Sequence, residues 1–209
     1  TATYRLKMSI DGDLQVAAGA AIDCRFKGFN KGKKYSGSGL GIHGGGAESL
    51  DLVRDSVYFP SEIGNGGNVD ATASRGGGAV WLTVGGGVVL NGDIDVHSTE
   101  NTGAWNGPGS GAPGAVYISA KSVSGSGMIH AEAPKIDRKG ADTPSGGRVA
   151  IYLTEANTLG LPIANVLCFG ALSGSSAGAG TVFVKTADQA NGTLYIKNTK
   201  FLKLLCQKF

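Results

Sequence analysis

The chain has 209 residues, of which 41% are hydrophobic and 17% charged, and its formal net charge is +3. The hydrophobic share excludes a disordered polar tract, and no apolar stretch approaches the ~20 residues that a membrane-spanning helix needs. Basic residues are scattered apart from short runs at 27–34 and 200–208. Because a nucleic-acid module needs a basic stripe with interleaved aromatic residues, we expect no nucleic-acid partner.

Glycine accounts for 36 residues, and its usual share is roughly 7%, less than half of what is present here. The glycines cluster between apolar runs, which is typical of tight corners and loops. The three cysteines, Cys24, Cys168 and Cys206, lack metal-ligand spacing, and the first two follow an apolar residue at a two-residue step. We therefore expect buried thiols, with no disulfide framework, no metal and no cofactor.

The N-terminal stretch carries three short apolar alternations, at 6–10, 14–16 and 22–24. A period of two predicts strands, and together they are expected to form a first coil. Residues 27–77 follow as a long Gly-rich excursion, and such segments are often functional or capping. The chain starts without a charged-then-apolar leader, which indicates either a cytoplasmic protein or a mature or excised fragment. We favour the fragment.

Four segments then repeat one phrase, a glycine followed by alternating apolar residues, at 78–84, 114–120, 147–153 and 180–186. Their leading glycines are 36, 33 and 33 positions apart, and a period in this range indicates a stacked array. Further short strands are predicted after the phrases. They lie at 88–90, 94–96, 122–124, 129–131 and 194–196.

The strands recur in the same order without helical patterns between them. This arrangement is best explained by a chain that coils so that equivalent strands stack in parallel. We therefore predict an all-β fold, a parallel β-helix (solenoid) of about four to five coils with long Gly-rich loops. Its interior would hold two columns of aliphatic side chains. These are Val80, Val116, Val149 and Val182, and one step on Leu82, Ile118, Ile151 and Val184.

The pattern predicts a single domain over residues 1–209. Its parts are a first coil at 1–26, the excursion at 27–77, repeated coils at 78–200 and a terminal cap or tail at 201–209, which would cover the open end or form a short helix. The repeat that begins at Gly147 is irregular after Leu153, and its later strand is placed either at 163–165 or at 165–169.

The repeated segments resemble the glycine-rich right-handed parallel β-helix repeats of large secreted or surface-anchored bacterial proteins. The matching stretches are 76–84 with 90–94, 122–129, 145–152, and 178–182 with 191–194. The resemblance implies the right-handed sense of the solenoid and a secreted or surface role, since many similar proteins are presumed adhesins or polysaccharide-associated. The chain departs from that pattern at 97–100, 112–113 and 132–134, and we look for function at such departures.

One departure suggests chemistry. If successive coils stack in register, Asp95 lies beside His130 and His97 beside Glu132 on the outer face, about 4.8 Å apart. Two acids and two imidazoles could hold a metal or act as acid and base on a polysaccharide bond. The alternative, which we favour, is an exposed ladder of opposite charges that contributes a few tenths of a kcal/mol per pair.

A second outward column contains Trp81, Tyr117, Ala150 and Phe183, and flat aromatic side chains can stack on sugar rings. The alternative is a small second core beneath the Gly-rich excursion, and we favour this burial. Arg148 and the charged loop at 135–139 supply the cation and base types that a lyase for acidic sugars needs, although a solvated charged loop explains them better.

The first expectation for function is an extracellular or cell-surface structural module of the adhesin type that binds a polysaccharide or cell-surface glycan. A polysaccharide-active enzyme, lyase or hydrolase, using Asp95, His97, His130 and Glu132 is the alternative. A self-assembly module, in which the aromatic face pairs chains, is the third. The sequence leaves the oligomeric state open.

Overall fold

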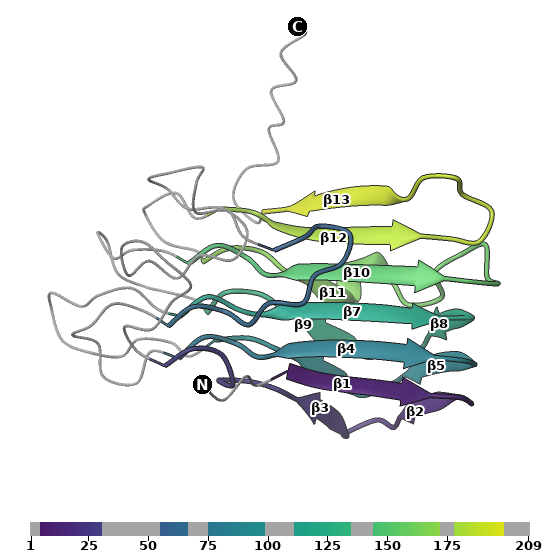
Figure 1. The fold of residues 1–209 in the computed structure, drawn as a ribbon, viewed down its shortest axis with the longest axis horizontal. Coiled ribbons are helices and arrows are strands. Elements are labelled where there is room, and N and C mark those ends of the chain that lie inside the picture. Colours follow the sequence, from purple (N-terminus) through teal and green to yellow (C-terminus); the bar gives the residue numbers. More distant parts are fainter. Residues whose placement is uncertain are drawn as a thin grey trace, which may run out of the picture.

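The structure of the chain is a computed structural model that describes residues 5–30, 55–66, 75–98, 111–134, 144–171 and 178–198 (Figure 1). Its largest sheet has the strand order β1-β4-β7-β10-β12-β13. These strands are β1 (Arg5–Ile10), β4 (Ala79–Val84), β7 (Ala115–Ala120), β10 (Arg148–Leu153), β12 (Gly180–Lys185) and β13 (Thr193–Lys197). The first five are parallel, and β13 runs antiparallel to β12.

Two smaller, parallel sheets lie behind the large one in Figure 1. The four-stranded sheet, in the order β11-β9-β6-β3, consists of β3 (Ala21–Asp23), β6 (Asp93–Asp95), β9 (Met128–His130) and β11 (Val166–Leu167). The three-stranded sheet, in the order β2-β5-β8, consists of β2 (Leu14–Val16), β5 (Gly87–Leu90) and β8 (Ser122–Ser124). Strands that are far apart in the sequence are therefore neighbours in every sheet.

The predicted columns of aliphatic side chains are present. Val80, Val116, Val149 and Val182 are register partners from strand to strand, and so are Leu82, Ile118, Ile151 and Val184. All eight belong to one buried cluster to which the three sheets contribute. Burying each such side chain stabilises the fold by about 1.5–3 kcal/mol, so the core accounts for the strict alternation within each phrase.

The predicted fold class, a right-handed parallel β-helix of four to five coils, is wrong. The three sheets have six, four and three strands, so they do not form a closed solenoid, and the six-stranded sheet is mixed because β13 is antiparallel. In the repeat that begins at Gly147, the segment 163–165 is a short 3-10 helix, and the two-residue strand β11 follows it. This repeat adds no strand to the three-stranded sheet. It has only an isolated parallel bridge between Ser124 and Gly160 there.

A hydrogen-bonded turn causes the reversal of β13. The Thr186 hydroxyl lies 2.6 Å from an Asp188 carboxylate oxygen, and the Gln189 backbone N–H donates to the Thr186 carbonyl at 3.2 Å. These bonds fold the chain back after β12, so 193–197 returns along the strand it has just left. The sequence prediction of a parallel strand at 194–196 therefore failed in direction, although a strand is present there.

Lys197 connects β13 to the repeat that begins at Gly147. Its ammonium donates to the carbonyl of Ile163 and to that of Val166, the latter at 2.6 Å. Burial lowers the pKa of Lys197 from its ordinary value. The end of the large sheet is thereby fastened to the 3-10 helix and to β11.

The glycine-rich segments that precede the strands of the large sheet in the sequence pack backbone against backbone. Gly77 donates to the Ala112 carbonyl and Gly114 to the Val96 carbonyl, each at 2.9 Å. A Cβ atom on Gly114 would lie 1.7 Å from the Gly78 carbonyl oxygen, which no side chain can tolerate. The glycine clusters are therefore required by the close approach of neighbouring segments.

The predicted burial of the Cys24 and Cys168 side chains is confirmed. Cys24 and Cys168 are buried, unpaired and part of the core cluster. Burial raises the pKa of the Cys168 thiol to about 12. Cys206 and the predicted tail at 201–209 lie outside the described residues.

Candidate functional site

Aromatic side chains form a continuous layer on the outer face of the six-stranded sheet. Trp81 stacks on Tyr117 with ring centroids 3.9 Å apart, and Tyr117 lies 5.4 Å from Tyr152, which lies 5.5 Å from Phe183. Trp81, Tyr117, Ala150 and Phe183 are register partners, as the sequence predicts. The aromatic layer is thus a direct consequence of the repeat.

Part of this layer is buried, as we favoured from the sequence. Tyr117 and Phe183 have less than a tenth of their surface exposed, and Trp81 is half-buried. Two further rings, Tyr58 and Phe59, pack on them: Tyr58 contacts the Phe183 ring edge-to-face at 5.0 Å, and Phe59 stacks on Tyr152 at 5.7 Å. These two cover the layer and yet remain 55% and 54% exposed.

The segment that presents Tyr58 and Phe59 is held by the side chain of Asp55. Its carboxylate accepts backbone N–H bonds from Ser56 at 2.9 Å, from Ser61 at 3.0 Å and from Glu62 at 3.1 Å. The Tyr152 hydroxyl also donates to the Tyr58 carbonyl at 3.0 Å. The two exposed rings are therefore displayed by a closed, hydrogen-bonded loop.

A pocket of about 450 Å³ opens between this loop and the turn that leads to β13. Rings form one side of it, and Lys185 and Asn191 supply polar groups. Its lining residues are Tyr58, Phe59, Tyr152, Phe183, Lys185, Ala190, Asn191, Gly192 and Leu194. Pockets that bind small ligands combine an apolar, aromatic wall with a few polar groups in this way.

The sequence prediction of this site was incomplete. Tyr152 lies two positions after Ala150 in the same strand, so the period of two that located Phe183 also places Tyr152 on the outer face. Tyr58 and Phe59 lie in the irregular segment 27–77, where no repeat assigns a position. Only the long-range packing of that segment brings them to the sheet.

Arg148, the other predicted ligand-binding residue, is buried. Only 3% of its surface is exposed, and its guanidinium donates to the Thr181 hydroxyl at 3.4 Å. Burial lowers the pKa of Arg148, and the negative charge of Asp55 partly offsets this effect. This attraction links the Asp55 loop to the sheet and gives Arg148 a structural role. The charged loop at 135–139 lies outside the described residues.

The predicted acid and imidazole groups form two pairs on neighbouring strands. Asp95 and His130 are register partners, as expected from the sequence. The Nδ1 atom of His97 lies 2.6 Å from an Asp95 carboxylate oxygen, and that of His130 lies 2.9 Å from a Glu132 carboxylate oxygen. Each imidazole is therefore held by the acid two residues away along its own segment.

These pairs are not the fully exposed ladder of charges expected from the sequence, because all four side chains are at least partly buried. The Glu132 hydrogen bond raises the pKa of His130, and burial opposes this. Glu132 Oε2 is buried without a hydrogen-bond partner among the described residues. An imidazole oriented by a carboxylate at Nδ1 can exchange a proton at Nε2, so the arrangement is compatible with acid-base chemistry.

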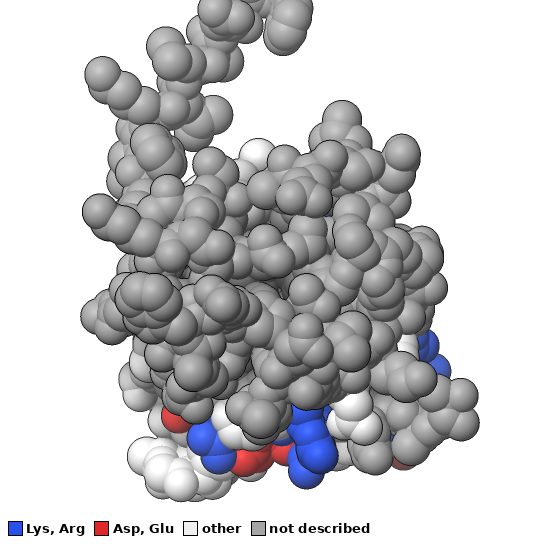
Figure 2. All heavy atoms as spheres, turned by 90° about the vertical axis from the view of Figure 1, so that its left-hand side faces the viewer, with Lys and Arg blue, Asp and Glu red and all other residues white. Residues whose placement is uncertain are grey.

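Cations and anions alternate near these pairs. Arg25 contacts Asp23 at 2.6 Å and approaches Asp95 at 3.8 Å. Viewed from the side on which the strands of the large sheet begin, basic and acidic atoms of described residues lie side by side along the lower edge (Figure 2). Local neutralisation of this kind favours a structural role for the charges.

Within the described part of the chain, no three His, Cys, Asp or Glu side chains are placed to hold a metal ion. None of the helices in these same ranges is long and apolar enough to cross a membrane.

The chain was compared with protein families, curated proteins and solved structures, and no match was found to any of them.

Proposed function

We propose that this chain is a non-catalytic module of an extracellular or cell-surface protein, and that it binds glycans on the aromatic face of its six-stranded sheet. The observation that carries the proposal is the pair of exposed rings, Tyr58 and Phe59, beside the 450 Å³ pocket. Exposed apolar surface costs solvation free energy and often marks a binding site.

The chemistry of the pocket suits a sugar. A pyranose ring has C–H groups on its faces, which pack against aromatic rings, and hydroxyl groups around its rim. Phe59 and Tyr58 offer the aromatic surfaces, while Lys185 and Asn191 can bond to hydroxyl groups. The Asp55 hydrogen bonds hold the loop in place before a ligand arrives, which reduces the entropy lost on binding.

The proposal predicts that Phe59→Ala weakens retention on a glycan array or the affinity for a retained glycan by about tenfold, as expected for the loss of one aromatic contact. Because Phe59 is largely exposed, the variant should keep the melting temperature of the parent to within a few degrees. Ile196→Ala is the matched control, since Ile196 is exposed on the same sheet and does not line the pocket. Unchanged retention of Phe59→Ala would reject the proposal.

The enzyme alternative is supported by the Asp95–His97 and His130–Glu132 pairs alone, and it stays a prediction. The self-assembly alternative also stays a prediction, and the covering of the aromatic layer by Tyr58 and Phe59 leaves it less free surface for pairing chains.

A further inference from the structure

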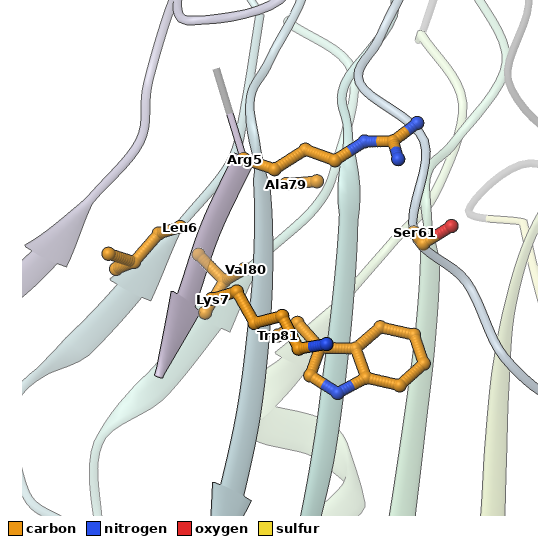
Figure 3. A pocket seen from close by; sticks show the side chains of 7 residues that line it. All are labelled: Arg5, Leu6, Lys7, Ser61, Ala79, Val80 and Trp81. Atoms are coloured by element: carbon orange, nitrogen blue, oxygen red, sulfur yellow. The ribbon is translucent and has the colours of Figure 1, made fainter. Parts of the chain in front are cut away.

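A second pocket, of about 240 Å³, lies on the same face at the opposite edge of the sheet (Figure 3). Ala79 forms its floor, and Arg5, Lys7, Ser61 and Trp81 surround it. In Figure 3 the Arg5 side chain extends across Ala79 toward the segment that carries Ser61, and Lys7 lies alongside the Trp81 ring. The remaining two lining residues, Leu6 and Val80, point to the opposite side of the sheet.

The strand register creates this space. Arg5 is paired with Ala79, and Lys7 is paired with Trp81. A methyl group therefore lies next to two long cationic side chains and a large ring, which leaves a hollow above Ala79. The indole is fixed from behind, because it stacks on Tyr117 with an interplanar angle of 20°.

Within the part of the chain that the structure describes, the charges of this pocket are not neutralised. No acidic side chain of that part lines it, and neither Arg5 nor Lys7 forms an ion pair there. Lys7 Nζ lies 6.0 Å from the centre of the Trp81 ring, its only charge-related contact in the described chain. Two other cations of the described chain do have acidic partners: Arg25 contacts Asp23 at 2.6 Å and Lys121 contacts Glu155 at 2.8 Å.

We propose that this pocket binds the carboxylate of an acidic sugar residue, a uronic acid, within an anionic polysaccharide. The planar guanidinium of Arg5 presents two parallel N–H donors that match a carboxylate, and Lys7 adds a second positive charge. Trp81 offers a wall for the sugar ring, and the Ser61 hydroxyl a further donor. The volume is below the roughly 300–1,000 Å³ of sites for drug-sized ligands, which suits a single sugar unit.

The inference rests on the proposed glycan binding and specifies its substrate class. β1 and β12 are separated by four strand spacings, or about 19 Å at 4.8 Å per spacing. An oligosaccharide lying across the strands can therefore contact the uronate pocket at β1 and the aromatic pocket beside β12 together. Binding at both sites of one ligand increases affinity through effective concentration.

The test uses an oligogalacturonate and its methyl ester, two ligands that differ in the carboxylate charge, with affinities measured by isothermal titration calorimetry. The parent chain should bind the acid more tightly, and this preference should decrease as salt is added. Arg5→Gln combined with Lys7→Gln should weaken binding of the acid by roughly tenfold or more and leave the ester unaffected. Lys27→Gln combined with Lys121→Gln removes the same number of positive charges from exposed positions outside the pocket, and so controls for net charge.

The outcomes separate the two proposals. If acid and ester bind equally and both depend on Phe59, the uronate pocket is overturned and glycan binding stands. If the acid binds through Arg5 and Lys7 without any effect of Phe59→Ala, the uronate pocket stands and the aromatic site is wrong. Tighter binding of a sulfated, carboxylate-free galactan oligosaccharide overturns the carboxylate assignment, and binding of no oligosaccharide overturns both proposals.

Discussion

His130 shows how one residue makes the stability of this protein depend on pH. Its imidazole lies 2.9 Å from the Glu132 carboxylate, and this contact raises the pKa of His130 above the ordinary value of 6.5. A raised pKa in the folded state means that the stabilisation is fully present below pH 6.5. It is lost as the pH rises through the raised pKa, when the imidazole gives up its proton.

We therefore expect His130→Gln to lower the free energy of unfolding by about 1 kcal/mol near pH 5.5, and by much less near pH 8.5. Urea unfolding monitored by circular dichroism at the two pH values measures the difference. Glu132→Gln should remove the same pH-dependent part, because it deletes the partner of the imidazole. An equal effect of His130→Gln at both pH values would show that the pair contributes no charge-dependent stability.

Among the elements, β13 differs most from the repeat, and its position depends on Lys197. The Lys197 ammonium bonds to two carbonyl groups at 163 and 166, in a partly buried position. Lys197→Met keeps the aliphatic stem and removes the donors, which leaves both carbonyl groups without this partner.

We expect Lys197→Met to lower the free energy of unfolding by about 1–3 kcal/mol, the usual cost of leaving buried polar groups unpaired. Thermal unfolding of the variant beside Lys121→Met provides the measurement. Lys121 is exposed and its pair with Glu155 lies at the surface, so the control should change stability by less than about 1 kcal/mol. Equal melting temperatures for the two variants would mean that β13 does not depend on Lys197.

For the molecule as a whole, stability depends on how closely the glycine segments approach one another. Gly114→Ala places a Cβ atom against the Gly78 carbonyl, between the first and second copies of the repeated phrase. The neighbouring strands cannot move apart without opening the core, so strain spreads through the stack.

We expect Gly114→Ala to destabilise the chain by about 3 kcal/mol or more, or to prevent soluble expression. Gly12→Ala is the matched control, because nothing lies within 4 Å of a Cβ atom at that corner. A melting curve for each variant compares them. Similar curves for both would contradict the close approach at Gly114.

The repeat accounts for what the sequence could predict about the site. The columns through Val80 and Trp81, and the pairing of Asp95 with His130, all depend on a constant offset between equivalent strands. The resemblance to surface-protein repeats stays a prediction. The solenoid predicted from the recurring strands is wrong, because the three sheets do not form a closed solenoid and β13 reverses. A turn of a few polar residues decides that reversal, and its effect on strand direction is not visible in a hydrophobic pattern.

The sequence by itself determined which side chains share a column, because alternation and a fixed period are local properties that hydrophobic burial enforces in each repeat. Only the tertiary structure decided how β13 adds to the edge of the large sheet and where Tyr58 and Phe59 lie. It also decided that Arg5 and Lys7 face a hollow that no acidic side chain of the described residues lines. These features depend on contacts between segments that share no period, so their geometry is set by packing and long-range hydrogen bonds.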